Sequence, residues 1–425
     1  MERNDALYRS YIDILREELL PAMGCTEPIA VAYAAAKARQ ELGALPTQVL
    51  VEVSGNIIKN VKSVVVPHTG GLRGIEAAAA AGIVAGQAER ELEVLSAVTE
   101  EQIAAMTEYL RSTEIRVRNI DSPFIFDIRV TLSAGEDTAM SRIVGTHTNL
   151  VQLRKNADMI INLPVSETVS ENYTDRSLLK VDKIVEFAEC LEIEDVEDIF
   201  ARQIEYNWDI AEEGMRNPYG ANIGKTLRSA YGDSVHNRAR YMAAAASDAR
   251  MNGCEKPVVI NSGSGNQGIT ASVPVIVYAR DIGVSKKTLY QALAVSNLST
   301  IHIKSNIGTL SAYCGAVSAG CGAAAGVAWL YGGRYEDIKH TLVNAMAIDS
   351  GIICDGAKAS CAGKIATAVD VGLMGYHMYR CGNEFVAGDG IVKNGIENTI
   401  TTVGLLARDG MADTDREIIR LMMEE

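Results

Sequence analysis

Apolar positions recur along the chain with two different periods. In residues 7–20 and 29–42 they return every three or four positions, which predicts two helices. Proline at position 21 ends the first helix, and Glu27-Pro28 opens the second, which is rich in alanine. From residue 48, β-branched and alternating segments predict strands at 48–54, 61–66, 114–119, 124–133 and 141–146. This first part of the chain therefore mixes helices and strands.

After residue 170 the helical period dominates. Helices are predicted at 177–191, 195–212, 219–251, 268–280, 286–299, 309–331, 335–348, 364–380, 394–407 and 413–424, with glycine-rich turns between several of them. The pattern predicts an α+β protein with a smaller α+β N-terminal domain and a larger all-helical C-terminal domain. We expect N-terminal helices in 1–44 that pack on the helical domain, an α+β domain in 45–170, and the helical domain in 171–425.

Composition supports a folded globular protein, and the charge excludes one class of partner. Apolar residues make up 48% of the chain and charged residues 22%. The formal net charge is −14, which opposes non-specific binding to nucleic acid. Aromatic residues are scarce at 5%, while alanine and glycine are abundant, so we expect helices that approach one another closely.

The chain carries no signal for secretion or membrane insertion. Its first nine residues are polar and charged, unlike a secretory signal. Residues 307–333 contain no charge and are long enough to span a bilayer, but glycine, alanine and serine dominate them, which favours a buried core helix. We therefore expect a cytoplasmic protein without membrane or nucleic-acid partners. Subunits rich in small-residue helices often form dimers, so a homodimer is one expected state.

Eight cysteines are present, and five of them follow residue 313. Clustered cysteines in a reducing compartment indicate metal binding or catalysis more often than disulfides. Cys314, Cys354 and Cys361 lie beside glycine-rich turns, and Lys358 and Lys364 flank the last of them. Positive charge and helix starts favour the thiolate form that iron–sulfur clusters require. Three ligands on a four-iron cluster would leave one iron open to a substrate.

The alternative interpretation is that these cysteines are small buried apolar residues, as free cysteines often are. Cys321 lies seven residues after Cys314 on a similar helix face and could compete as a ligand. The chain has no CxxC pair, which argues against most zinc sites. Three further cysteines lack glycine-rich surroundings and are predicted to lie in the core: Cys190, Cys254 and Cys381.

Two residues near the N-terminus could act on a proton. Cys25 stands at a helix start, where backbone amides lower the pKa of a thiol, so it could serve as a base or a ligand. The same motif also fits a plain N-terminal turn. His68, in a turn with Pro67 and Gly70, could contact substrate or act as the base, although a turn histidine is more often merely exposed.

A glycine-rich loop before a predicted helix could bind a carboxylate. Free amides at a helix start attract anions, and polar side chains would add donors. The alternative is a simple turn into the helix. The candidate substrate-binding residues of this loop are Ser262, Ser264, Asn266 and Gln267.

Together these motifs resemble the L-cysteine desulfidase family, which is related to the α-subunit of iron–sulfur L-serine dehydratases. The resemblance covers nearly the whole chain, up to Gly390. Its ordered motifs are Gly-Cys-Thr-Glu-Pro at 24–28, Ser-Gly-Ser-Gly-Asn-Gln-Gly at 262–268, Ser-Asn-Ile-Gly at 305–308 with Cys314, and Cys-Asp-Gly-Ala-Lys at 354–358 with Cys361.

The resemblance implies a specific chemistry. Members of that family convert L-cysteine and water to sulfide, ammonia and pyruvate without pyridoxal phosphate. It implies that Cys314, Cys354 and Cys361 bind a [4Fe-4S] cluster in the helical catalytic domain. It also implies that Cys25 is the catalytic cysteine, the base that removes the α-proton of a small amino-acid substrate.

Three alternatives remain open. Serine dehydratases have a longer gap between the last two cluster cysteines, so the seven-residue gap here favours the desulfidase. A pyridoxal phosphate lyase is suggested by the loop at 264–268, but a Ser-x-Lys for the Schiff base and a later phosphate cup are missing. A non-enzymatic iron–sulfur sensor is the third, although the presence of Cys25 with all three candidate ligands favours an enzyme.

Overall fold

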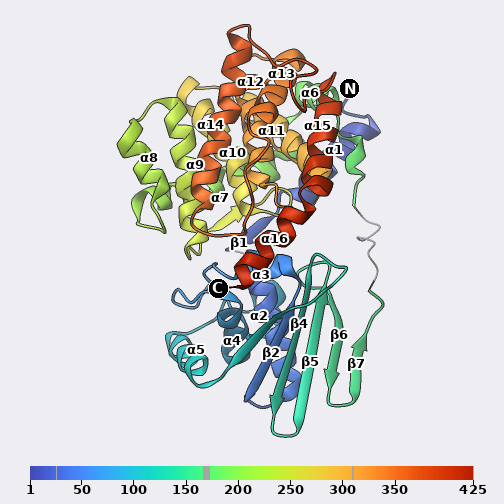
Figure 1. The fold of residues 1–425 in the computed structure, drawn as a ribbon. Helices are drawn as coiled ribbons and strands as arrows, with labels where there is room; N and C mark the ends of the chain where they lie inside the picture. The colour runs from blue at the N-terminus through green and yellow to red at the C-terminus, as the bar shows by residue number, and fades with distance from the viewer. Residues whose placement is uncertain (25, 166–172, 309–310, 425) are drawn as a thin grey trace.

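The chain folds into a sheet-containing part and a larger helical part. The computed structural model describes residues 1–24, 26–165, 173–308 and 311–424. Figure 1 shows the helical part above the sheet, with the C-terminal helix running down between them. One buried core occupies each part, and the α+β class predicted from the sequence is confirmed. The domain boundaries remain a prediction.

The sheet has six strands in the order β3-β2-β4-β5-β6-β7. β2 and β3 run parallel, and the other neighbours run antiparallel. Along β2, buried residues alternate with more exposed ones, as expected for a sheet with one covered face. The strands are β2 (Gln48–Val53), β3 (Ile115–Asn119), β4 (Asp127–Ala134), β5 (Asp137–Val144), β6 (Leu150–Lys155) and β7 (Asp158–Asn162).

Helices cover the inner face of this sheet. The central one is α2 (Thr26–Leu42), which packs on β4 and β5 and is almost entirely buried. α4 (Gly74–Ala85) lies against α2 so closely that a side chain at Gly82 would collide with the backbone of Ala32. Short side chains make this approach possible. The other helices of this part are α3 (Gly55–Val61), the 3-10 turn Ala88–Glu93 and α5 (Glu100–Ser112).

The first two helices pack in different places, and one strand prediction is corrected. The helices of residues 1–44 do not stay together: α1 (Ala6–Glu18) packs in the helical core, whereas α2 packs on the sheet. The reason is that α1 has one apolar face, while α2 is buried on all sides over residues 28–36 and needs cover there from both the sheet and α4. The strand expected at 61–66 is not formed either. α3 ends at Val61, and Val64 and Val66 are buried in the turn that follows, so core burial outweighs their strand preference.

The helical part is built around α12 (Gly315–Leu330). Every residue from Ala316 to Leu330 is buried, which accounts for the uncharged stretch in the sequence. Across the residues that the structure describes, no helix is long and apolar enough to cross a membrane. The surrounding helices are α6 (Val181–Cys190), α7 (Ile193–Arg216), α8 (Ile223–Tyr231), α9 (Val235–Met251), α10 (Gly265–Ile282), α11 (Lys286–Ile307), α13 (Tyr335–Ile348), α14 (Cys361–Arg380) and α15 (Ile396–Leu405).

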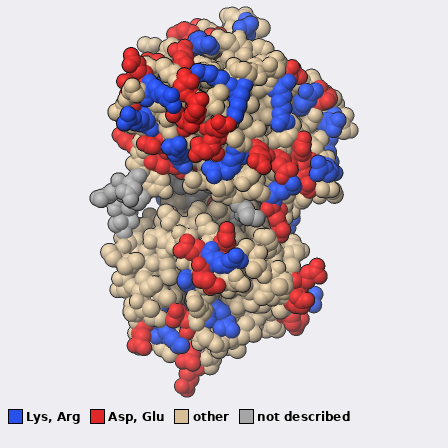
Figure 2. All heavy atoms as spheres, turned by 180° about the vertical axis from the view of Figure 1, so that it is seen from behind, with Lys and Arg blue, Asp and Glu red and all other residues tan. Residues whose placement is uncertain are grey.

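Two connections bring the parts together. β1 (Pro21–Met23) pairs antiparallel with β8 (Pro257–Val259), which places Gly24 beside the segment that leads from α9 to α10. α16 (Ala412–Met423) leaves the helical part and packs on α3, where Ile419 covers Gly55. Residues of the N-terminal part and of the helical part therefore meet at one junction. Seen from behind, Figure 2 shows a waist at this level, with acidic and basic side chains interspersed over the helical part.

Candidate functional site

Three predicted cysteine ligands lie together at this junction. Cys314 precedes the first residue of α12, and Cys361 is the first residue of α14. The loop that carries Cys354 is held to the segment before α12, because Cys354 N–H donates to the Ala312 carbonyl (2.6 Å) and Cys314 N–H donates to the Ile352 carbonyl (3.0 Å). All three side chains are half-buried. We call this group, Cys314, Cys354 and Cys361, the cysteine site.

The surroundings of Cys354 favour the thiolate form of its sulfur. The pKa of Cys354 is lowered to about 5, chiefly by a hydrogen bond that the Cys314 thiol donates to its sulfur. The charges of Lys59 and Lys364 and the Gly356 amide lower the pKa further, whereas burial opposes the shift. The same hydrogen bond and burial raise the pKa of Cys314 well above its ordinary value. The hydrogen bond therefore favours the thiol form of Cys314 and the thiolate form of Cys354.

Lysines surround this charge from three segments. Lys59 comes from α3, Lys304 from the last turn of α11, and Lys364 from the first turn of α14. Burial lowers the pKa of Lys304 to about 8, although the nearby Cys354 and Cys314 sulfurs favour its charged form. Lys364 Nζ also donates to the Ile353 carbonyl (2.7 Å), which fixes it beside the cysteine loop. Positive charge and two helix starts make this an environment that stabilises thiolates.

Cys361 approaches the other two cysteines and joins them to the rest of the junction. Burial raises the pKa of Cys361, and the negative charge of the nearby Cys354 sulfur raises it further. Its side chain packs with Val64 and Met251, so it touches both parts of the molecule. Its sulfur lies 3.6 Å from the Gly356 carbonyl oxygen.

The donor set suits a cluster better than a single ion. Among the described residues, no three His, Cys, Asp or Glu side chains converge closely enough to hold one metal ion. Each thiolate of an iron–sulfur cluster binds a different iron, so its ligands lie farther apart than the ligands of one ion. Three half-buried sulfurs in thiolate-stabilising surroundings fit that requirement.

Cys321 does not take part. It is 2% exposed within α12, and burial raises its pKa far above the ordinary value, so it behaves as a core thiol. Cys254 is buried, Cys190 is half-buried against the helical core, and Cys381 is exposed at the end of α14. Cys381 thus differs from its predicted core position, because it follows the last turn of its helix.

The glycine-rich loop lies next to the cysteine site through its amide side chains. The Gln267 side chain rests on Gly315, directly after Cys314, where a Cβ atom would come within 2.6 Å of it. Its Oε1 atom is buried and accepts no hydrogen bond from the described residues. Asn266 faces Arg250 (Nη1 to Oδ1, 3.4 Å) and the sulfur of Met251 (3.5 Å). An unused acceptor and an amide beside an arginine suit the amino and carboxylate groups of an amino acid.

The serines of the loop have local partners. Ser264 caps α10 by accepting from the Gln267 amide at 3.5 Å. Ser262 adopts a positive φ of 49° and donates to Asn261 Oδ1 at 2.8 Å. Asn261 is itself buried and bound to Asn297, so both serines shape the turn. Their predicted contact with substrate remains a prediction.

The motif at 24–28 and the His68 turn meet beside Arg250. Cys25 lies outside the described residues, but its neighbour Gly24 is in place: the Gly24 carbonyl accepts from Arg250 Nη2 (3.1 Å). A Cβ atom at Gly24 would lie 2.7 Å from Pro67, the residue before His68. His68 has a positive φ of 59° and its Nδ1 lies 3.1 Å from Glu255 Oε1. Arg250 therefore links Gly24 to Asn266.

Sequence patterns alone do not single out the charged groups at the junction. Arg250 is 8% exposed at the end of α9, and Lys59 is 1% exposed within α3. The sequence neighbours of Lys59 and Lys304 are of mixed character, Asn56-Ile57-Ile58-Lys59-Asn60 and His302-Ile303-Lys304-Ser305, so no apolar run marks either lysine. What distinguishes these groups is their burial beside the cysteine site, which only the fold reveals.

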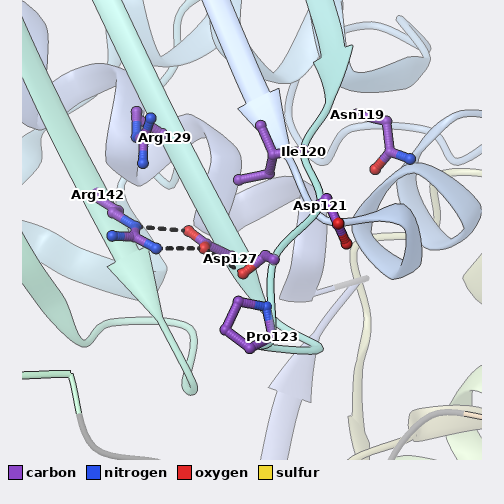
Figure 3. Close-up of a pocket in the computed structure, with 8 residues that line it drawn as sticks. Asn119, Ile120, Asp121, Pro123, Asp127, Arg129 and Arg142 are labelled. Carbon is purple, nitrogen blue, oxygen red and sulfur yellow. Dashed lines mark hydrogen bonds and ion pairs between the residues drawn. The ribbon is translucent and has the colours of Figure 1, made fainter.

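A pocket lies elsewhere, at one end of the sheet. This sheet pocket has a volume of about 450 Å³ and is lined by Asn119, Ile120, Asp121, Ser122, Pro123, Asp127, Arg129 and Arg142. Figure 3 shows the Arg142 guanidinium turned onto the Asp127 carboxylate, with hydrogen bonds of 3.0 and 2.7 Å. None of the predicted site residues lines it.

With this geometry in view, comparison with known proteins identifies the family. Residues 89–420 match the family described as the serine dehydratase alpha chain, a span that includes all three cysteines of the site. The chain belongs to the serine dehydratase alpha chain family. That match leaves out the first 88 residues, which hold the Gly24 motif, Lys59 and His68.

Full-length relatives include those first residues. The chain is 55% identical to a UPF0597 protein of Desulfitobacterium hafniense, over 100% of this chain and 99% of the relative. It is 49% identical to a UPF0597 protein of Lachnoclostridium phytofermentans, over 98% of this chain and 100% of the relative. A UPF0597 protein of Treponema denticola is 46% identical, over 100% of both chains. Membership of the family indicates a lyase of the dehydratase type.

Proposed function

We propose that this serine dehydratase family member is an iron–sulfur-dependent lyase that works without pyridoxal phosphate. It would carry out α,β-elimination on a small amino acid, with L-cysteine and water as substrates and sulfide, ammonia and pyruvate as products. The observation that carries the proposal is the meeting of Cys314, Cys354 and Cys361 at two helix starts, beside buried lysines.

These three cysteines would hold a [4Fe-4S] cluster. The thiolate character of Cys354 and the lysines around it favour the charged ligands that such a cluster needs. When bound, a cluster with three protein ligands supplies one open iron, a Lewis acid toward the sulfur or oxygen on the substrate β-carbon.

The chain's own residues would bind the substrate and move its α-proton. Arg250 and Asn266, with the free amides at the start of α10, suit the substrate carboxylate. Gln267, whose Oε1 is unused among the described residues, suits the ammonium group. Gln267 contacts Gly315 beside the cysteine site, and Arg250 contacts Gly24, so a substrate held by these side chains would lie near the motif at 24–28.

Elimination then needs one base. A base takes the α-proton, the C–H electron pair forms the Cα–Cβ double bond, and sulfide leaves with the C–S pair. Aminoacrylate remains, tautomerises to an imine, and reacts with water to give pyruvate and ammonia. Cys25 is the proposed base. His68 is the second candidate, because its turn packs against Gly24 and Glu255 orients its ring.

L-Serine dehydration is the second candidate function. The family description itself names serine dehydratases, which supports it. The same elimination would then expel water in place of sulfide. The short gap of seven residues between Cys354 and Cys361 favours the desulfidase.

The test is an anaerobic assay. The purified chain is reconstituted with iron and sulfide, and the release of sulfide and pyruvate is measured with L-cysteine and with L-serine. We expect cluster-dependent sulfide release that is lost in Cys354→Ala and Cys25→Ala and kept in the control Cys321→Ala, which alters a core cysteine. Pyruvate from serine alone would establish the dehydratase. A chain that binds no iron would overturn the proposal.

A further inference from the structure

Lys59 is buried at the junction although it belongs to neither the cysteine loop nor the loop before α10. It lies on α3, in the N-terminal part, and only 1% of it is exposed. Its ammonium group forms an ion pair with Asp415 of α16 and lies 3.4 Å from the carbonyl oxygen of Ser311, three residues before Cys314. Even a paired lysine is costly to bury, because the desolvation of the two charges can exceed what their attraction returns, so this placement calls for a reason beyond packing.

The same residue touches the cysteine loop through its backbone. Gly356 has a φ of +94°, and a side chain there would collide with the Lys59 carbonyl oxygen. Gly356 also supplies the amide that binds the Cys354 sulfur. After the hydrogen bond from Cys314, the charge of Lys59 is among the causes that lower the pKa of Cys354. Lys59 therefore acts on Cys354 by contact with its loop and by its charge.

Asp415 makes this charge depend on the C-terminal helix. No residue of α16 is fully buried, yet the helix is held to α3 at two points and to the residue after α3 at a third. Asp415 pairs with Lys59, Ile419 covers Gly55, and the Met422 carbonyl accepts from Lys62. The position of α16 thus sets how far the positive charge of Lys59 is neutralised.

We propose that Lys59 is a positioning residue of the cysteine site, whose charge stabilises the negatively charged iron–sulfur cluster, and that α16 adjusts this effect through Asp415. This inference rests on the proposed function. A cation near a cluster favours its reduced, more negative form, and an anion disfavours it. Removing the two partners must therefore shift the reduction potential in opposite directions, whereas simple damage to the fold would not.

The test is a redox titration of the reconstituted cluster, followed by electron paramagnetic resonance, on the full chain. Lys59→Met keeps the length of the side chain and removes its charge, and we expect a more negative potential. Asp415→Asn leaves Lys59 without its counter-ion, and we expect a more positive one. Arg420→Gln changes the charge of α16 at an exposed position, away from Lys59, and should leave the potential unchanged.

Iron retention gives a second readout. In the presence of a chelator, Lys59→Met should lose iron roughly 10-fold faster than the unaltered protein, in the range usual for residues that support metal ligands. Equal potentials in all four proteins, or shifts of the same sign for Lys59→Met and Asp415→Asn, would overturn the inference. If Lys59→Met does not fold, the sign of the Asp415→Asn shift decides. Failure of the unaltered chain to bind iron would instead overturn the proposed function.

Discussion

The sheet pocket and the cysteine site both place charge below the surface, but they treat it differently. In the sheet pocket the Asp127 carboxylate is completely buried and is bound by both a guanidinium and the Ser122 hydroxyl. Arg129 leans toward Glu52, 3.6 Å away. In the cysteine site the charged sulfur of Cys354 is half-exposed and faces lysines from three segments.

The difference separates a structural charge from a reactive one. A carboxylate that accepts several hydrogen bonds from fixed partners has little left to offer a ligand. A half-exposed thiolate stabilised by surrounding cations can still bind iron. The charge in the sheet pocket is therefore the less reactive of the two, although the pocket there has a volume of about 450 Å³.

Loss of a cysteine ligand should have the largest effect. We expect Cys354→Ala to bind almost no iron and to lower activity by about 100-fold or more, because changes in residues that only support ligands already cost 10–100-fold. Iron content and sulfide release would be measured after anaerobic reconstitution. Cys321→Ala is the matched control. Equal losses in both variants would mean that the helical core, and not the site, had been damaged.

Substitutions in the sheet pocket should lower the stability of the protein and leave its activity unchanged. Asp127→Asn leaves Arg142 facing a neutral partner, and breaking a buried ion pair costs about 4 kcal/mol. We expect that decrease in the free energy of unfolding, measured with urea, and an unchanged kcat/KM in the folded protein. Adding Arg142→Met should recover part of the loss. A fall in kcat/KM at full stability would show that the sheet pocket takes part in the reaction.

Gly356 is where the two parts touch the cysteine loop together. Gly356→Ala combines a left-handed backbone with a collision against Lys59, so we expect a loss of about 3 kcal/mol in unfolding free energy. Gly388→Ala is the control, since its φ is also positive, +102°, but nothing lies within 4 Å. It should cost about 1 kcal/mol. Similar losses in both would argue against tight contact at the junction.

Much of the fold follows from the period of apolar residues. The helix expected at 335–348 is α13 (Tyr335–Ile348), and the helix expected at 268–280 lies within α10. β6 and β7 were not predicted. β7 carries a short apolar run, Met159-Ile160-Ile161, but it has no period-two alternation, and its side chains stay largely exposed in the structure. Turn 61–66 shows the opposite failure, since its valines mark the core and not a strand.

The candidate site could be predicted only in part. Glycine-rich turns pointed to Cys314, Cys354 and Cys361, and the structure brings those three together. Lys59 and Arg250 were not predicted, because their distinguishing feature is burial between segments that are far apart in the sequence. Ser262 and Ser264 were attractive as polar residues near a helix start, but a turn uses the same residue types for its own hydrogen bonds.

A smaller effect should come from Asp349, five residues before Cys354. Burial raises the pKa of its carboxyl group to about 6, and its Oδ2 accepts no hydrogen bond from the described residues. The folded state therefore holds this proton more tightly than the unfolded state, and stability is lost as the pH rises through 6. Between pH 4 and pH 7.5, Asp349→Asn should gain about 2 kcal/mol relative to the unaltered protein. Urea unfolding of both proteins at both pH values measures this gain. If the difference in unfolding free energy between the two proteins is the same at pH 4 and pH 7.5, the Asp349 carboxylate does not destabilise the fold.

The central claim is that three cysteines hold a four-iron cluster with one open iron. Mössbauer spectroscopy of the chain reconstituted with ⁵⁷Fe tests it directly, before and after addition of L-cysteine under anaerobic conditions. We expect the spectrum of a [4Fe-4S] cluster in which a single iron changes its parameters when the substrate is added. A spectrum without a cluster, or a cluster whose four irons all remain unchanged by either L-cysteine or L-serine, would contradict the account.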